Sequence, residues 1–455
     1  MTDPIDPLVI VNAEVDGVLV DVQLAGGRIE SIVPRGQKRS LGPHLDADGG
    51  ALLPGLHDHH LHLLALGASL ASVDVSGGLD ALRHAPPGPW IRAQGYHEAV
   101  GAIDRYQLDA VISHRPVRVQ HRSGALWILN SLALELLGVD GATDPGIERD
   151  TTGTPTGRLF RMDDWIRRRA GSITPDLAVV GRLLAGFGVT GVTDATPTSD
   201  VGYLRTVVDA QRVGSIRQHV VHTGGPSLGP TSWAIRGPAK VVIGDHHLPD
   251  LSELISVFRR LHNDGTAVAV HCVTRVGLLL ALAAWDEAGS FPGDRVEHGA
   301  VMSLDEALRV RAHDLTVVTQ PHFVAERGDS YLDDVDRVDI PDLWRCGSLI
   351  AAGLRVAGST DAPYGSANPW LAMAAAVDRA TPGGRVLGGA EAVSGRVALG
   401  LFLGPLDRPA DGISRRVEVG VPADLCLVDR PLARLFDDLR AVSVRSTLIG
   451  GSVAV

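Results

Sequence analysis

Seven apolar segments rich in β-branched residues recur through the middle of the chain, and a helical pattern follows each of them. They span residues 188–195, 216–225, 239–245, 266–273, 294–299, 315–321 and 354–361, and GALLPGLHDHH at 50–60 precedes them as an eighth. Strands that are apolar throughout and alternate with helices are typical of a parallel sheet covered on both faces. Eight such units predict an α/β fold, and a closed (β/α)8 barrel rather than an open sheet.

The two ends of the chain have a different pattern. Short apolar runs separated by Gly-rich turns are typical of small antiparallel strands. We therefore predict one small β-sandwich domain built from both termini, residues 1–53 and 406–455, and a barrel over residues 54–405.

Residues 70–175 lie between the first and second barrel strands, and we predict that they form an inserted lobe. Within it, VRVQHRS (117–123) predicts a strand and ALWILNSLALELLG (125–138) predicts a helix. Insertions beside a barrel mouth commonly shape specificity.

Two helix starts can be recognised between the predicted barrel strands. Thr174 followed by Pro175 fits an N-cap with proline at the first helical position. Ser303 with Glu306 forms a capping-box pattern before an apolar-periodic run.

Charge and composition exclude several classes of partner. The net charge is −11 and no basic run occurs, which argues against nucleic acid and against an acidic membrane surface. The cysteines Cys272, Cys346 and Cys426 are too scattered for a disulfide framework or a cysteine zinc site. No apolar run is long enough to span a membrane, and the N-terminus lacks the basic start of a signal peptide. We expect a cytoplasmic protein that binds a small molecule.

The segment LPGLHDHHLH at 53–62 contains two His-x-His pairs, His57/His59 and His60/His62. Because side chains alternate along a strand, only one pair can point into a barrel. The later pair lies nearer the C-terminal end of the strand, where barrel enzymes place their reactive groups.

Other strand ends carry residues of the same kind. His271, His298 and Asp361 end the fifth, sixth and eighth segments, and Lys240 lies near the start of the fourth. Imidazole and carboxylate groups are the ligands of a divalent first-row metal that keeps a position open for water. Each residue alone has an ordinary alternative, such as a core histidine, a turn aspartate or a surface Glu297–His298 ion pair. Their occurrence at successive strand ends favours a metal site.

Lys240 is unusual because only two of the 42 Lys and Arg residues are lysines, the other being Lys38 in a polar loop. A lysine that extends its amine to solvent is the ordinary alternative, but arginine would serve equally well there. Burial lowers the pKa of a lysine and leaves its amine neutral. A neutral amine can take up carbon dioxide as a carbamate, whose two oxygens can bridge two metal ions, and this favours a two-metal site.

Together these segments resemble the amidohydrolase superfamily. PGLHDHHLH is similar to its P-G-x-x-D-x-H-x-H first-strand signature, which places the first ligands at His60 and His62 and turns His57 and His59 toward the helices. GVTGVTDA, AKVVIGD, VAVHC, RVEHG and GSTDAP resemble its second, fourth, fifth, sixth and eighth strands, and ADGGALLPG and VGVPADLCLVD its flanking β-sandwich. The resemblance implies two divalent ions, with zinc expected and Lys240 carbamylated, held by His60, His62, Lys240, His271, His298 and Asp361.

Within the superfamily, SGALWILNSLAL, QPH and DAPYGSANPW most resemble the N-substituted formamide deformylase group, amidohydrolase family three. The chain has Gly124-Ala125 where that group usually has Gly-His. This departure implies that a contact on the substrate side is lost and that the substrate differs.

The resemblance implies hydrolysis of a C–N bond in an amide, formamide, carbamate or cyclic amide. The metals would lower the pKa of a bridging water and polarise the carbonyl, and Asp361 would act as general base and then as general acid. The candidate substrate contacts, for each of which a structural role is an equal alternative, are His222, Gln320, His322 and Trp127.

Two alternatives stay open at this stage. A deaminase of a heterocycle would use one metal and a nearby glutamate, but the sequence CVTRVG after His271 offers no such residue. A non-catalytic binding protein would show gaps in the ligand set. The assembly is also open, and a homodimer is compatible with the sequence.

Overall fold

A computed structural model describes residues 7–37, 43–170, 175–198, 200–229, 231–244, 248–412 and 414–455, without the side chains of 164 and 167. Lys38, the helix start predicted at Thr174 and residue 245 of the fourth predicted strand lie outside these residues. The chain divides into two compact units, one of Met1–Leu63 with Leu177–Val455 and one of Leu64–Asp176.

Eight parallel strands form the centre of the larger unit. One sheet has the order β14-β13-β6, and the other runs from β15 to β19 in chain order. The strands are β6 (Leu56–Leu61), β13 (Val189–Asp194), β14 (His219–His222), β15 (Ala239–Val242), β16 (Val268–Cys272), β17 (Arg295–His298), β18 (Thr316–Thr319) and β19 (Arg355–Gly358). Each of them overlaps a predicted segment, and the predicted α/β class is confirmed.

Main-chain hydrogen bonds link the two parallel sheets at both junctions. At one junction, the Lys240 N–H donates to the Gly224 carbonyl over 2.8 Å. At the other, the Asp361 N–H donates to the His60 carbonyl over 2.7 Å, and the His62 N–H donates to the Ala362 carbonyl over 2.8 Å. The ends of β6 and β19 are therefore held side by side.

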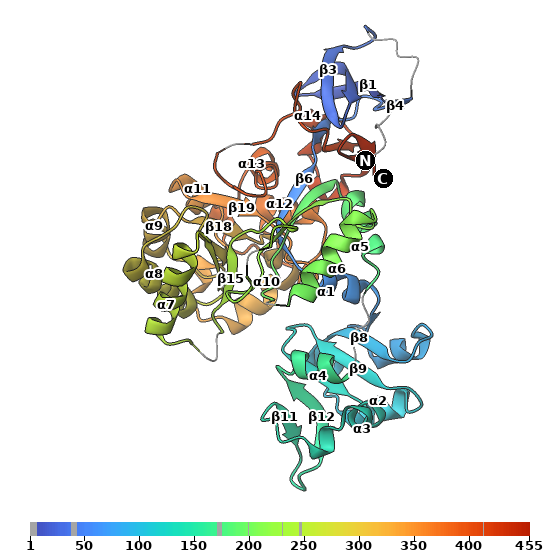
Figure 1. Ribbon diagram of the computed structural model, residues 1–455, viewed down its shortest axis with the longest axis vertical. Helices are drawn as coiled ribbons and strands as arrows, with labels where there is room; N and C mark the ends of the chain where they lie inside the picture. The colour runs from blue at the N-terminus through green and yellow to red at the C-terminus, as the bar shows by residue number, and fades with distance from the viewer. Residues whose placement is uncertain are drawn as a thin grey trace. The chain divides into compact units, whose positions relative to one another are not determined.

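Helices follow the strands in the larger unit, and Figure 1 shows α5 to α12 around the parallel sheets, whereas α14 lies by the outer sheets. They are α5 (Leu177–Gly186), α6 (Val201–Arg212), α7 (Leu251–Asn263), α8 (Arg275–Ala288), α9 (Leu304–Ala312), α10 (His322–Asp334), α11 (Gly347–Ala351), α12 (Pro369–Asp378), α13 (Gly395–Gly400) and α14 (Leu432–Leu435). The capping box predicted at Ser303 and Glu306 is confirmed, with both reciprocal hydrogen bonds present before α9. Among the described residues, no helix combines the length and the apolar character needed to cross a membrane.

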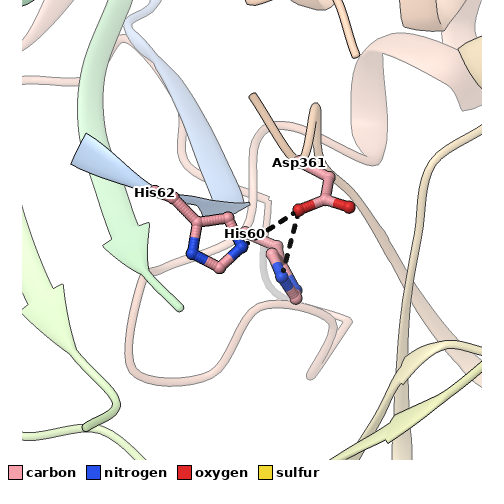
Figure 2. Close-up of side chains that lie close together, drawn as sticks. All are labelled: His60, His62 and Asp361. Carbon is pink, nitrogen blue, oxygen red and sulfur yellow. Dashed lines mark ion pairs between the residues drawn. The ribbon is translucent and has the colours of Figure 1, made fainter. Parts of the chain in front are cut away.

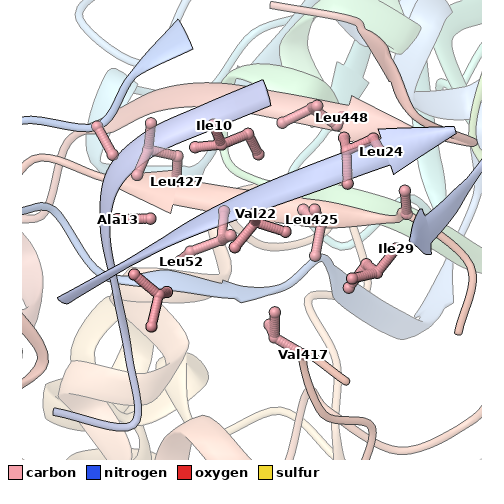
Figure 3. Close-up of a cluster of buried hydrophobic side chains, with 13 residues drawn as sticks. Ile10, Ala13, Val22, Leu24, Ile29, Leu52, Val417, Leu425, Leu427 and Leu448 are labelled. Carbon is pink, nitrogen blue, oxygen red and sulfur yellow. The ribbon is translucent and has the colours of Figure 1, made fainter. Parts of the chain in front are cut away.

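Two further sheets of the larger unit combine strands from both ends of the chain. The first, β3-β2-β1-β4, and the second, β22-β21-β20-β5, share one buried apolar cluster (Figure 3). The strands are β1 (Leu8–Val15), β2 (Val18–Ala25), β3 (Arg28–Pro34), β4 (His44–Asp46), β5 (Leu52–Pro54), β20 (Leu425–Val428), β21 (Val444–Ile449) and β22 (Ser452–Val453). Val22 and Leu24 of the first sheet and Leu425 and Leu427 of the second alternate along their strands, so each pair shares one face toward this cluster.

The predicted first barrel strand is in fact two strands that meet at Gly55. β5 pairs antiparallel with β20, whereas β6 pairs parallel with β13. A Cβ atom at Gly55 would collide with the side chain of Thr190, and the Gly55 N–H donates to the Asp424 carbonyl over 2.8 Å. Glycine therefore allows the chain to pass from one sheet to the other with close backbone packing.

The smaller unit contains a six-stranded sheet of order β11-β12-β10-β9-β8-β7. Its elements are α1 (Leu63–Leu70), β7 (Val73–Asp74), β8 (Ile91–Tyr96), α2 (Arg105–Val111), β9 (Val117–His121), β10 (Leu126–Leu129), α3 (Ser131–Leu137), β11 (Ile147–Arg149), β12 (Pro155–Phe160) and α4 (Asp163–Ala170). The strand predicted at VRVQHRS is confirmed as β9. The helix predicted over 125–138 is wrong in its first half, because Leu126–Leu129 pairs with both β9 and β12, and Asn130 caps α3 only afterwards.

Candidate metal centre

Three side chains converge where β6 and β19 end. His60 lies in β6, His62 follows its last residue, and Asp361 follows β19. The Asp361 Oδ1 atom lies 3.2 Å from His62 Nε2 and 3.5 Å from His60 Nε2 (Figure 2). Each residue offers one ligand atom, and these atoms lie within 4.8 Å of one another. Two imidazole nitrogens and a carboxylate oxygen at this spacing fit a divalent metal ion.

The other predicted ligands surround this triad. Lys240 Nζ lies 3.3 Å from His60 Nε2. The ring of His298 lies 4.8 Å from that of His60 and 4.5 Å from that of His271, measured between centroids. The structure thus brings all six predicted ligand residues together, and their role as ligands stays a prediction.

Partners at Nδ1 orient three of the histidines. The His60 Nδ1 hydrogen-bonds Glu297 Oε2, His298 Nδ1 lies 2.8 Å from Gln320 Oε1, and His62 Nδ1 lies 3.1 Å from Thr196 Oγ1. A histidine that uses Nδ1 for such a contact keeps its Nε2 lone pair available for a metal.

Glu297 lies among the candidate ligands, although its place in the sequence indicates only a surface ion pair with His298. The structure buries Glu297 completely, with Oε1 lying 2.6 Å from Arg295 Nε. Burial raises the pKa of Glu297, but the charges of Arg295 and Lys240 outweigh this effect and lower it below its usual value. The available signal was the spacing of Arg295 and Glu297, because alternation along a strand places both side chains on one face.

Burial favours the neutral forms of Lys240 and of the candidate histidine ligands. Burial lowers the pKa of Lys240, although Glu297 and Asp361 act in the opposite direction. Burial, followed by the charge of Lys240, lowers the pKa of His271 to about 3. His60 and His298 are also shifted well below the usual histidine pKa, mainly by burial. Neutral imidazole is the form that coordinates a metal.

The predicted orientation of His59 toward the helices stays a prediction, and the strand that carries this residue is irregular. The register between β6 and β13 shifts after Asp58↔Val192 and before Leu61↔Asp194, so simple alternation fails at this point. His59 is fully buried, and its ring lies edge-on to that of His57 with 6.1 Å between centroids. Burial, aided by the charges of Arg295 and Arg415 and opposed by that of Glu297, lowers the pKa of His59 to about 3.

Two of the predicted substrate contacts lie at the ends of parallel strands. His222, the last residue of β14, is 1% exposed, and its ring nitrogens have no hydrogen-bond partner among the described residues. Its Nδ1 lies 3.8 Å from Asp194 Oδ2. Gln320 lies just after β18. Its Oε1 contacts His298 Nδ1, and its Nε2 donates to the Ser359 hydroxyl over 2.8 Å. Gln320 is therefore placed to orient His298 rather than to meet a substrate.

The remaining two predicted contacts are both buried. His322 begins α10, and a Cβ atom at Gly365 would collide with its ring. Trp127 belongs to the core of the smaller unit, where its Nε1 donates to Asp163 Oδ1 over 2.7 Å and its ring packs in the cluster that contains Leu134. The structure thus gives Trp127 the position of a lobe anchor.

Comparison of the sequence with known protein families gives a match that covers all of the candidate ligand residues. The sequence model of the amidohydrolase family matches residues 44–455, which include the entire metal centre. The chain belongs to the amidohydrolase family. This confirms the family expected from the motifs, and it makes the protein a hydrolase.

The amidohydrolase is 25% identical to an N-substituted formamide deformylase from Arthrobacter pascens, over 98% of this chain and 97% of that protein. Its fold is similar to crystal structures of two uncharacterized metal-dependent hydrolases. The one from Pyrococcus horikoshii has a TM-score of 0.77 at 21% identity, covering 93% of this chain and 98% of that one. The one from Pyrococcus furiosus has a TM-score of 0.74 at 21% identity, covering 93% and 99%.

Proposed function

We propose that this amidohydrolase is a metal-dependent hydrolase of C–N bonds in small amides, formamides, carbamates or cyclic amides. The observation that carries the proposal is the convergence of His60 Nε2, His62 Nε2 and Asp361 Oδ1. When bound, the metal would polarise the carbonyl of the substrate and lower the pKa of the attacking water. The similarity to the formamide deformylase of Arthrobacter pascens supports N-substituted formamides as the first class to test.

Asp361 is the residue we assign to proton transfer. Its Oδ1 faces His60 and His62, and its Oδ2 lies 3.9 Å from His298 Nδ1. Its backbone has φ of 51°, a left-handed conformation that is uncommon outside glycine and is concentrated at functional sites. From this position the carboxylate would accept the proton of the attacking water and deliver it to the leaving nitrogen.

Lys240 supports a centre for two divalent ions, with zinc as the expected metal. It is 2% exposed, its pKa is lowered by burial, and its amine lies beside His60. A neutral amine in this place is suited to carbamate formation. The carbamate, His60, His62, His271, His298 and Asp361 would then form the complete ligand set.

The architecture we propose is a closed (β/α)8 barrel, a β-sandwich from both termini and an inserted lobe. The barrel is supported by eight parallel strands and by main-chain hydrogen bonds at both junctions of their two sheets. The sandwich is supported by the shared core of the two outer sheets (Figure 3). The lobe is supported by the separate compact unit Leu64–Asp176.

The decisive experiment combines metal analysis with a substrate panel. Protein purified without chelators should contain close to two divalent ions per chain and should hydrolyse one or more of a set of N-substituted formamides, simple amides and carbamates. His62→Ala should lose metal and turnover together, because a coordinating nitrogen is removed. His44→Ala, which changes an exposed histidine of β4, is the matched control and should lose neither. A metal-free wild type with no turnover on any class would overturn the proposal.

A further inference from the structure

A cavity lies at the opposite ends of the parallel strands from the candidate metal centre. It has a volume of 470 Å³, and its walls include Pro54, His57, His219, Leu406, Arg415 and Asp424. His219 is the first residue of β14, and His57 is the second of β6, whereas the metal centre gathers where strands end. A mostly apolar cavity of this size with a few polar groups is typical of a small-molecule site.

Arg415 gives this cavity a positive charge that the protein does not pair. The Arg415 Nη2 donates to the Gly55 carbonyl, and among the described residues no carboxylate forms an ion pair with the guanidinium. The nearest acid that acts on it, Asp424, already has both oxygens engaged, by His219 Nε2 at 2.9 Å and by the Gly450 N–H at 2.7 Å. Burial, opposed only by Asp424, lowers the pKa of Arg415 to about 10. A partly desolvated guanidinium that no carboxylate of the described residues pairs with favours an anionic ligand.

His57 adds a hydrogen-bond acceptor of fixed orientation. It is 6% exposed, and its Nδ1–H donates to the Gly404 carbonyl over 2.8 Å. That contact fixes the tautomer and leaves Nε2 with its lone pair. Burial lowers the pKa of His57 well below its usual value, so the ring stays neutral.

We propose that this cavity is a second ligand site, which binds a small organic carboxylate with an apolar body. The carboxylate would pair with Arg415, the apolar body would contact Pro54 and Leu406, and an O–H or N–H of the ligand would donate to His57 Nε2. The bound carboxylate would contact the strand that carries His60. His57 belongs to this strand, β6, and Arg415 is hydrogen-bonded to Gly55, the residue that precedes it.

The test is a calorimetric titration of the metal-loaded, full-length enzyme with 3-hydroxybenzoate, which carries both the carboxylate and an O–H donor. Methyl 3-hydroxybenzoate is the uncharged control ligand, and it should bind at least about tenfold more weakly because it cannot pair with Arg415. Arg415→Gln should weaken the binding of 3-hydroxybenzoate by a similar factor. Arg434→Gln, which changes an exposed arginine outside the cavity, should leave the affinity unchanged.

A further variant covers the case in which Arg415→Gln fails to fold after losing its contact with Gly55. Leu406→Trp fills the cavity and keeps Arg415, and it should abolish binding while the melting temperature stays close to that of the wild type. Binding of 3-hydroxybenzoate at the metal centre would be insensitive to both Arg415→Gln and Leu406→Trp. Unchanged affinity in these variants, equal affinity for acid and ester, or no binding by the wild type would each overturn the proposal.

Discussion

The hydrogen bond between His60 Nδ1 and Glu297 Oε2 joins β6 to β17 across 237 residues of sequence. It is buried on both sides, with His60 1% exposed and Glu297 fully buried. Arg295 lies against the other oxygen of Glu297, which keeps the carboxylate charged without a solvent contact. This arrangement directs His60 Nε2 toward Asp361 and makes Glu297 a positioning residue for the proposed ligand.

Glu297→Gln should test this role. The amide keeps an oxygen near His60 Nδ1 but loses the charge that Arg295 compensates, so we expect metal affinity to fall by about 10- to 100-fold. A competition titration with a chromophoric chelator measures the affinity, and thermal unfolding of the same sample checks that the fold persists. Glu418→Gln is the exposed control. Wild-type affinity in Glu297→Gln would show that the carboxylate does not position His60.

His62 and His59 should behave differently when they are replaced. His62→Ala removes a proposed coordinating nitrogen and should abolish metal binding and turnover together. His59 has ring nitrogens without a hydrogen-bond partner among the described residues, so His59→Leu replaces an unsatisfied polar group by an apolar one of similar size. We expect His59→Leu to retain its metal and to melt no more than a few degrees below the wild type. Loss of metal in His59→Leu alone would show that His59 takes part in the site.

The apolar pattern predicted the parallel strands well, because strands buried on both faces need continuous apolar runs. The irregularity of β6 could not be predicted, since the register shift depends on how β6 pairs with β13, a partner more than a hundred residues away. The division of the first strand at Gly55 likewise depends on contact with Thr190. The sequence of Leu126–Leu129 does not distinguish a strand from a helix, because a short apolar run fits either element until its neighbours are known.

Reactivation of metal-free enzyme should require carbon dioxide if Lys240 becomes a carbamate. Only the neutral amine reacts, and its fraction rises with pH through the pKa of Lys240, which burial shifts downward. Addition of zinc in bicarbonate-free buffer should therefore restore little activity. At equal concentrations of dissolved carbon dioxide, reactivation should be faster at pH 8 than at pH 6. Intact mass spectrometry measures formation of the carbamate, and turnover measures the recovery of activity. Full reactivation without bicarbonate, or a single bound ion, would contradict the carbamate-bridged centre.

Asp361→Asn separates proton transfer from assembly of the site. The amide keeps an oxygen near His60 and His62 but cannot accept the proton of the attacking water. We expect a folded protein that keeps most of its metal, while kcat falls by at least about a hundredfold. Metal content, melting temperature and turnover are measured on one preparation. Wild-type turnover in this variant would exclude Asp361 as the base and direct attention to His222, whose ring nitrogens have no hydrogen-bond partner among the described residues.

Trp127→Ala should reduce the stability of the lobe rather than change which amide is preferred. Trp127 is 5% exposed, its indole N–H is bonded to Asp163, and the guanidinium groups of Arg92 and Arg118 lie over its ring. Truncation of such a residue costs roughly 3 to 5 kcal/mol. Trp127→Phe, which keeps most of the packing, should lose less. Thermal unfolding and the ranking of amide substrates, measured on both variants, test the assignment. An altered ranking with an unchanged melting temperature would instead make Trp127 a substrate contact, because an anchor of the core cannot be removed without destabilising it.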